Sequence, residues 1–190
     1  MKNVILFSFM ALLSVSSVLA QIDRGTVALG VDATFNRTNY DFGPNIGEST
    51  TTTLGGEVGI GFFVAENLSI GGALGLLRTS AEADNITSAQ NETAFNAFGS
   101  YYVPLGENFY LPLTAGAGFN SIRFEDPGVE DYSINGFNFI LRAGLEYLVA
   151  EKIGVRFSLG PQFGELGSDD LITDIDYSNW KFFVGTIFYF

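Results

Sequence analysis

The sequence predicts an all-β fold, an eight-stranded antiparallel up-and-down transmembrane β-barrel. Three observations lead to this prediction. Apolar residues alternate with small or polar residues in eight short segments, as they do in strands with two different faces. Short and long connections between these segments alternate strictly. The chain also ends in KFFVGTIFYF, where aromatic residues continue the alternation without a polar tail.

The N-terminus indicates export. Lys2 precedes the apolar run VILFSFMALLSVSSVLA, whose end carries a small-residue cleavage pattern. The alternative is a transmembrane anchor, but the run is short for a span and is interrupted by serines. We therefore expect residues 1–20 to be a cleaved signal peptide and residues 21–190 to form one outer-membrane β-barrel domain. The chain has no Cys, which excludes disulfides and thiolate metal sites.

The strands are predicted from period-two alternation. In the first segment, every second residue from Val27 through Val31 to Phe35 is apolar and lies on one face. The eight predicted strands are 26–36, 53–64, 68–78, 93–103, 109–124, 137–149, 153–163 and 178–190. Pro112 and Pro161 each remove a ladder hydrogen bond. Because both fall near predicted strand ends, we expect them at the barrel rim, in bulges.

The connections predict the topology. The short ones, 65–67, 104–108 and 150–152, have the length of hairpin turns. The long ones are polar and cover 37–52, 79–92, 125–136 and 164–177. This alternation places both termini on the side of the short turns.

The second face of the strands decides between two environments. It carries Gly, Ala and Ser together with scattered charges. In a soluble, lipocalin-like barrel the apolar face would be the core and this face would be solvated. In a membrane barrel the apolar face meets lipid and this face lines a narrow lumen. Small residues suit a crowded eight-stranded interior, and aromatics near strand ends resemble the girdles of membrane barrels. We therefore predict the membrane form.

Charge is segregated along the chain, which has a net charge of −12. The long connections hold most of the acids, with Arg37 as their only base. Their acidic residues are Asp41, Glu48, Glu82, Asp84, Glu92, Glu125, Asp126, Glu130, Asp131, Glu165, Asp169, Asp170, Asp174 and Asp176. The sequence therefore predicts four acidic loops on one side of the molecule.

The predicted lumen contains equal numbers of acids and bases: Asp32, Glu57, Arg142, Glu146, Arg156 and Lys181. We expect these charges to be paired, because an unpaired buried charge is costly. Across the turn at 150–152, Glu146 falls opposite Arg156, which predicts a cross-strand ion pair. Lys181 and Asp32 become neighbours only if the last strand closes on the first.

The last strand carries Phe182, Val184, Phe188 and Phe190 on its apolar face. This pattern resembles the C-terminal signal that the outer-membrane assembly machinery reads in bacterial β-barrels. The mature chain resembles small eight-stranded outer-membrane barrels of the OmpA/OmpX type and the porin-like outer-membrane β-barrel families. The resemblance implies a bacterial outer-membrane location, with the N- and C-termini on the periplasmic side. It also implies outer-membrane lipid and the assembly machinery as partners, a monomer, and no nucleic acid.

The residue types limit the possible chemistry. Without His or Cys, the chain has no Ser-His or Cys-His nucleophile pair and no imidazole base. We expect no enzymatic activity and no cofactor. Asp169, Asp170, Asp174 and Asp176 could supply paired carboxylates or calcium ligands. Their sequence context favours a solvated, charged loop.

Two functions remain open at this stage. The first is a structural anchor that displays its acidic loops for surface interactions with a ligand that the sequence does not identify. The second is a narrow, porin-like channel for small solutes or ions. The interior of an eight-stranded barrel is just wide enough for side chains, and charges at several heights would fill it. The sequence therefore favours the anchor.

Overall fold

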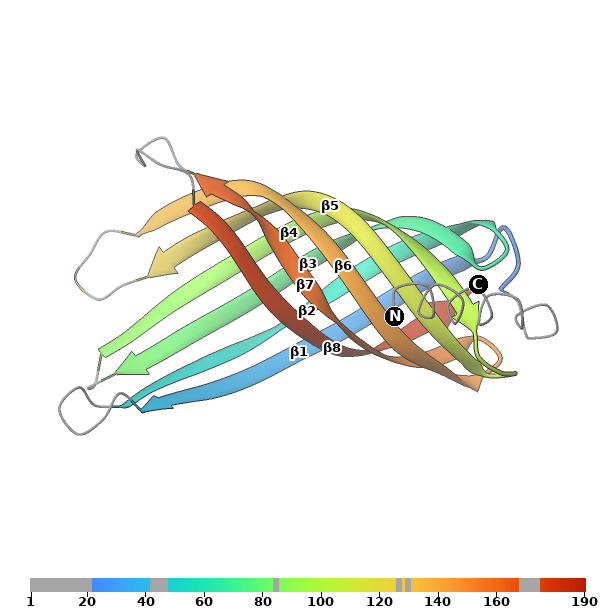
Figure 1. Ribbon diagram of the computed structural model, residues 1–190, viewed down its shortest axis with the longest axis horizontal. Helices are drawn as coiled ribbons and strands as arrows, with labels where there is room; N and C mark the ends of the chain where they lie inside the picture. Colours follow the sequence, from blue (N-terminus) through green and yellow to red (C-terminus); the bar gives the residue numbers. More distant parts are fainter. Residues whose placement is uncertain (1–21, 42–47, 84–85, 126–127, 129–130, 168–174) are drawn as a thin grey trace, which may run out of the picture.

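The computed structural model describes residues 22–41, 48–83, 86–125, 128, 131–167 and 175–190. These residues form eight antiparallel strands, each paired with the next, and the last closes on the first (Figure 1). The strands are β1 (Val27–Asp41), β2 (Glu48–Ala65), β3 (Leu68–Ala83), β4 (Ile86–Pro104), β5 (Phe109–Glu125), β6 (Tyr132–Ala150), β7 (Ile153–Gly167) and β8 (Ile175–Tyr189). The predicted up-and-down barrel is confirmed. The expected signal peptide, residues 1–20, lies outside the described residues and stays a prediction.

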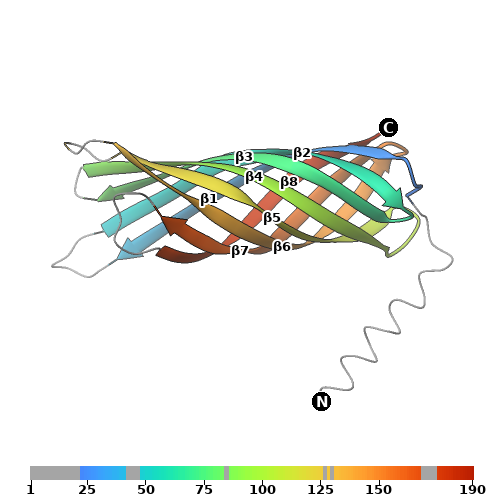
Figure 2. The same ribbon diagram turned by 90° about the horizontal axis from the view of Figure 1, so that it is seen from above.

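The short connections gather at one end of the barrel, where β1 begins and β8 ends (Figure 2). Val27 and Phe190 exchange backbone hydrogen bonds of 3.1 and 2.9 Å there. In the β2–β3 turn, Asn67 adopts a φ of 58°, a left-handed conformation that Asn tolerates better than most residues. Its side-chain oxygen accepts a 2.9 Å hydrogen bond from the backbone N–H of Ile22. This contact fastens the segment before β1 to the turn.

At the opposite end, most strands are longer than predicted. β2 begins at Glu48 rather than at residue 53, and β4 begins at Ile86 rather than at residue 93. The prediction ended each strand where its apolar alternation ended. The ladders nevertheless continue through polar sequence, as in the Thr-rich start of β2, where Thr53 and Thr79 are register partners joined by a 3.0 Å hydroxyl hydrogen bond. β-Branched Thr favours strands wherever it lies.

This extension corrects the prediction of four acidic loops. Several of the acids assigned to loops lie on strands. They are Asp41, Glu48, Glu82, Glu92, Glu125, Glu165 and Asp176. Asp84, Asp126, Glu130, Asp169, Asp170 and Asp174 lie outside the described residues. The acidic end of the molecule therefore consists partly of strand ends and not of loops alone.

The apolar face of the sheet points outward. Phe35, Phe137 and Trp180 are 63%, 72% and 70% exposed. The buried positions hold many small and polar side chains, among them the fully buried Asn120 and Glu146, together with an aromatic cluster at the short-turn end. A soluble barrel would reverse these faces, so the lipocalin-like alternative is wrong. The described residues contain no helix that is long and apolar enough to cross a membrane.

The two prolines interrupt ladders without shifting the register. Pairing between β5 and β6 skips Pro112 and resumes with the same partner offset. Pairing between β6 and β7 skips Pro161 in the same way. The register shifts of the described strands lie elsewhere, at Phe63/Ala65 and Leu148/Ala150. Pro112 lies near the end of β5, as expected, whereas Pro161 lies in the body of β7, and neither proline forms the expected bulge. The missing N–H costs a local hydrogen bond but requires no extra residue.

Candidate functional site in the barrel interior

An aromatic cluster closes the interior at the short-turn end. Phe63 lies 5.2 Å from Tyr102 and 6.2 Å from Tyr189, measured between ring centroids. Tyr110 packs edge-on against Tyr102 at 6.4 Å. Ile22, which precedes β1, is buried in the same cluster. The rings come from strands on different sides of the barrel, so they fill its cross-section.

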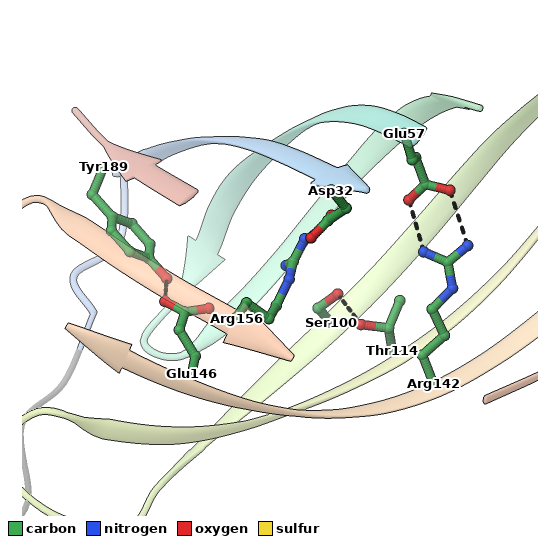
Figure 3. A network of polar contacts seen from close by, with 8 residues as sticks. All are labelled: Asp32, Glu57, Ser100, Thr114, Arg142, Glu146, Arg156 and Tyr189. Atoms are coloured by element: carbon green, nitrogen blue, oxygen red, sulfur yellow. Dashed lines mark hydrogen bonds and ion pairs between the residues drawn. The ribbon is translucent and has the colours of Figure 1, made fainter. Parts of the chain in front are cut away.

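The first charged layer begins at Tyr189, a member of this cluster, and includes Glu146, Arg156 and Asp32 (Figure 3). The Tyr189 hydroxyl donates a short hydrogen bond to Glu146. Arg156 donates a 2.5 Å hydrogen bond to Asp32, within an ion pair whose carboxylate side chain is only 4% exposed. Gly185 of β8 is the register partner of both Arg156 and Asp32. Because Gly185 has no side chain, the arginine on β7 can reach over β8 to the carboxylate on β1.

The second layer is an ion pair that spans the bore. Both guanidinium Nη atoms of Arg142 on β6 donate to the carboxylate of Glu57 on β2, at 2.7 and 2.9 Å. β2 and β6 lie on opposite sides of an eight-stranded ring. Both side chains are about nine-tenths buried. The guanidinium also lies 4.4 Å from the ring centroid of Phe183, a cation–π contact. This bidentate pair crosses the lumen from wall to wall.

The third layer lies farther from the short turns and also joins opposite strands. Lys181 on β8 donates a 2.8 Å hydrogen bond to Glu92 on β4. Gln162 donates a longer one, 3.3 Å, to the same oxygen and another of 3.1 Å to the Tyr177 hydroxyl. Asn120 also donates to that hydroxyl, at 3.0 Å. The layer is therefore a polar network that reaches across β4, β5, β7 and β8.

Two cavities remain between these layers. One, of about 40 Å³, is lined by Ser100, Thr114 and Arg142 among others. The other, of about 30 Å³, lies beside Asp32 and Tyr102. Each has room for only about one water molecule. In this part of the barrel, side chains occupy the interior.

All six charges predicted for the lumen lie on the interior, but their predicted partners differ from the observed ones. Glu146 and Arg156 are register partners, as expected. Arg156 nevertheless forms its ion pair with Asp32, and Glu146 accepts from Tyr189. Lys181 pairs with Glu92 rather than with Asp32, which lies farther along the seam. Side chains long enough to cross the bore have more candidate partners than the adjacent strand offers.

Glu92 is the functional residue that sequence reasoning missed, because it was assigned to a loop junction. Its signal was present in the alternation. Asn96 and Ser100 on β4 are buried, and counting back in steps of two from Asn96 places Glu92 on the same face. Asn120 and Gln162 already lie on this face of their predicted strands, and Tyr177 joins them once β8 is extended back to Ile175.

The other predicted site residues lie outside the lumen. Phe182, Val184 and Phe190 are exposed on the outer face, and Phe188 is half-buried. Asp176 is exposed on β8, whereas Asp169, Asp170 and Asp174 lie outside the described residues. Within the part of the chain that the structure describes, no group of three or more acidic side chains could hold a metal ion. The assembly signal stays a prediction.

Known proteins share this architecture. The family model described as "Outer membrane protein beta-barrel domain" matches residues 5–188. Neisserial surface protein A superposes with a TM-score of 0.56 at 14% identity, over 90% of this chain and 99% of its own. Ail, the attachment invasion locus protein of Yersinia pestis, gives 0.54 at 14% identity over 88% and 99%. E. coli outer membrane protein W gives the same values. At these identities the likeness is one of fold. No curated protein matches the sequence.

Proposed function

Because the chain belongs to the outer membrane protein beta-barrel domain family, we propose that it is an outer-membrane anchor with a filled interior. Its surface interactions are made by the strand extensions and connections at the end opposite the short turns. In this proposal that end is extracellular, and both termini face the periplasm. The protein is not an enzyme. The interior charges hold one another and the barrel together.

The observation that carries the proposal is the pair of wall-to-wall ion pairs. Arg142–Glu57 joins β6 to β2, and Lys181–Glu92 joins β8 to β4. A solute passing along the bore would have to break both pairs in a desolvated interior. Removing one partner of a buried pair costs about 3–5 kcal/mol, because a charge is left uncompensated. The aromatic cluster closes the same route at the short-turn end.

The opposite rim supports the surface role. Glu82, Asp131 and Glu165 are exposed there. Arg123 offsets part of this charge through a 2.7 Å ion pair with Asp131. Exposed pairs of this kind contribute at most about 1 kcal/mol. The rim is therefore a solvated, acidic surface that is free to interact with polar partners.

Single-channel conductance tests the filled interior and its alternative, a narrow channel. The mature protein is refolded in detergent, checked by heat-dependent gel mobility, and added to a planar bilayer beside Arg142→Met and Lys181→Met. We expect no conductance steps from the wild type. We expect none from either single variant, because the other ion pair and the aromatic cluster remain. Discrete wild-type steps that change in size or ion selectivity in these variants would establish a gated channel and refute the anchor.

The orientation is tested by labelling single cysteines, which is clean because the chain has no Cys. Asp131 lies at the far rim, and Glu151 lies in the β6–β7 turn; both are exposed. We expect a membrane-impermeant maleimide to label Asp131→Cys in intact cells and Glu151→Cys only after the outer membrane is permeabilised. The reverse result would place the short turns outside the cell.

A further inference from the structure

The barrel is closed unevenly at the junction of β1 and β8. The ladder between these strands runs only from Ala28↔Tyr189 to Ala33↔Val184. On their other sides, β1 stays paired with β2 as far as Asp41, and β8 stays paired with β7 as far as Ile175. Figure 1 shows the two strands separating towards those ends. We call this stretch the open seam: residues 34–41 of β1 facing residues 175–183 of β8.

A cavity of about 500 Å³ lies at the open seam, within the range of about 300–1,000 Å³ typical of small-molecule sites. It is more than ten times larger than either interior cavity. We call it the seam pocket. Its lining residues are Thr34, Phe35, Asn36, Thr53, Leu77, Thr79, Glu92, Leu159, Asn179, Trp180, Lys181 and Phe182.

The two ends of the seam pocket differ in chemistry. Its inner end contains Lys181 and Glu92, whose side chains are 9% and 14% exposed. Its outer end contains Phe35, Trp180 and Phe182, all of them exposed on the outer face. The pocket therefore joins a buried polar pair to the apolar surface that meets lipid. Unpaired backbone is costly at membrane depth unless it lines a cavity or has a partner, and a bound molecule here would cover it.

We propose that the seam pocket binds a single-chain amphiphile that enters sideways from the membrane. The acyl chain lies against Phe35, Trp180 and Phe182, and the head reaches the Lys181–Glu92 pair. The head carries no net charge, because Glu92 already compensates Lys181 at 2.8 Å. Hydroxyl groups suit this pair, since they can accept from the ammonium and donate to the carboxylate. The Arg142–Glu57 pair closes the route from the pocket towards the short turns.

Trp180, the only tryptophan of the chain, reports on occupancy from the pocket mouth. The probe is a monoacylglycerol with a dibrominated acyl chain, titrated into the protein refolded in phosphatidylcholine vesicles, because bromine quenches nearby indole fluorescence. We expect quenching that saturates. The fatty acid and the phosphatidylcholine with the same brominated chains should quench only in proportion to their concentration in the membrane. Equal quenching by all three probes would mean contact with surrounding lipid alone and would overturn the proposal.

A matched reporter separates the pocket from the general lipid surface. Trp180→Phe combined with Phe137→Trp moves the indole to an equally exposed position on the outer face of β6. This reporter should show no saturation with the monoacylglycerol probe. Saturation at both positions would also refute a site at the seam.

Recognition of the head is tested by removing both charges together, in Glu92→Gln with Lys181→Met, so that neither is left unpaired. We expect the half-saturating probe concentration to rise about tenfold, the loss expected for one charge-assisted hydrogen bond. Unchanged binding in a variant with normal heat-dependent mobility would contradict the assigned polar end.

Entry through the seam is tested by a reversible lock. The β1–β8 ladder ends at Ala33↔Val184, and Phe35 and Phe182 are the next outward-facing residues on either side of the seam, so a disulfide in Phe35→Cys with Phe182→Cys would draw the two strands together. We expect the reduced protein to show saturable quenching at a higher half-saturating probe concentration than the wild type, because two acyl-chain contacts are lost, and the oxidised protein to lose saturable quenching. Equal binding by both forms would exclude the seam as the entrance. The seam pocket goes beyond the anchor role. Conductance steps from the wild type would refute the filled anchor but not the pocket. A lack of saturable quenching in the wild type would refute the pocket but not the anchor.

Discussion

The Arg142–Glu57 pair makes a quantitative prediction about stability. Arg142→Met leaves the Glu57 carboxylate, which is 10% exposed, without its bidentate partner. It also removes the cation–π contact with Phe183. We expect the free energy of unfolding to fall by about 3–5 kcal/mol, the usual cost of breaking a buried pair from one side. Glu57→Gln should cost a similar amount, because it leaves the guanidinium of Arg142 without a charged partner.

The double variant distinguishes this explanation from a simple loss of packing. With Arg142→Met and Glu57→Gln together, no charge is left unpaired, so the loss should be smaller than that of either single variant. The assay is equilibrium denaturant unfolding in phospholipid vesicles, followed by Trp180 fluorescence. Arg78→Met is the control, because its 3.5 Å pair with Glu125 is exposed and should contribute less than about 1 kcal/mol. A double variant whose loss equals the sum of the two single losses would refute the reasoning.

Two further predictions concern closure and assembly. Gly185→Ala places a Cβ against the Asp32 carboxylate and the backbone of β1, so the unfolding free energy should fall by about 1–3 kcal/mol; Gly106→Ala, in an open turn, is the control, and equal losses would contradict a close approach at Gly185. Phe190→Ser should lower the amount of folded protein in the outer membrane of cells while leaving refolding in vesicles nearly unchanged, measured by heat-dependent gel mobility. Phe109→Ser, an exposed aromatic at the same end, is its control, and an equal loss in cells would remove the special role of the last residue.

The sequence was most informative where one structural rule acts alone. Side chains alternate strictly along a strand, so the faces of Asp32, Arg142 and Lys181 could be predicted from position alone. The register across a two-residue turn is equally local, which is why Glu146 and Arg156 are opposite one another as expected. The outward apolar face also followed from the small residues on the other face.

Ion-pair partners could not be predicted in the same way. They depend on which residues of two opposite strands lie at the same level along the barrel axis. That level is set by the stagger of the strands in the closed barrel. No local sequence pattern predicts that Arg142 faces Glu57 across the bore. The strand ends were also underestimated, because beyond the apolar band both faces are polar and alternation disappears. Glu92 was therefore assigned to a loop junction, although its spacing from Asn96 places it on the inner face, and Lys181 was left without its partner.

The two wall-to-wall pairs also have a mechanical consequence. β2, β4, β6 and β8 are every second strand of the ring, so the Arg142–Glu57 and Lys181–Glu92 pairs run along diameters a quarter-turn apart. A thin cylinder yields most easily by becoming oval, which shortens one diameter and lengthens the one perpendicular to it. Flattening the barrel along either of these two diameters stretches the ion pair that runs along the other. Lateral pressure from the bilayer along either of these diameters therefore meets a tube that is braced against it.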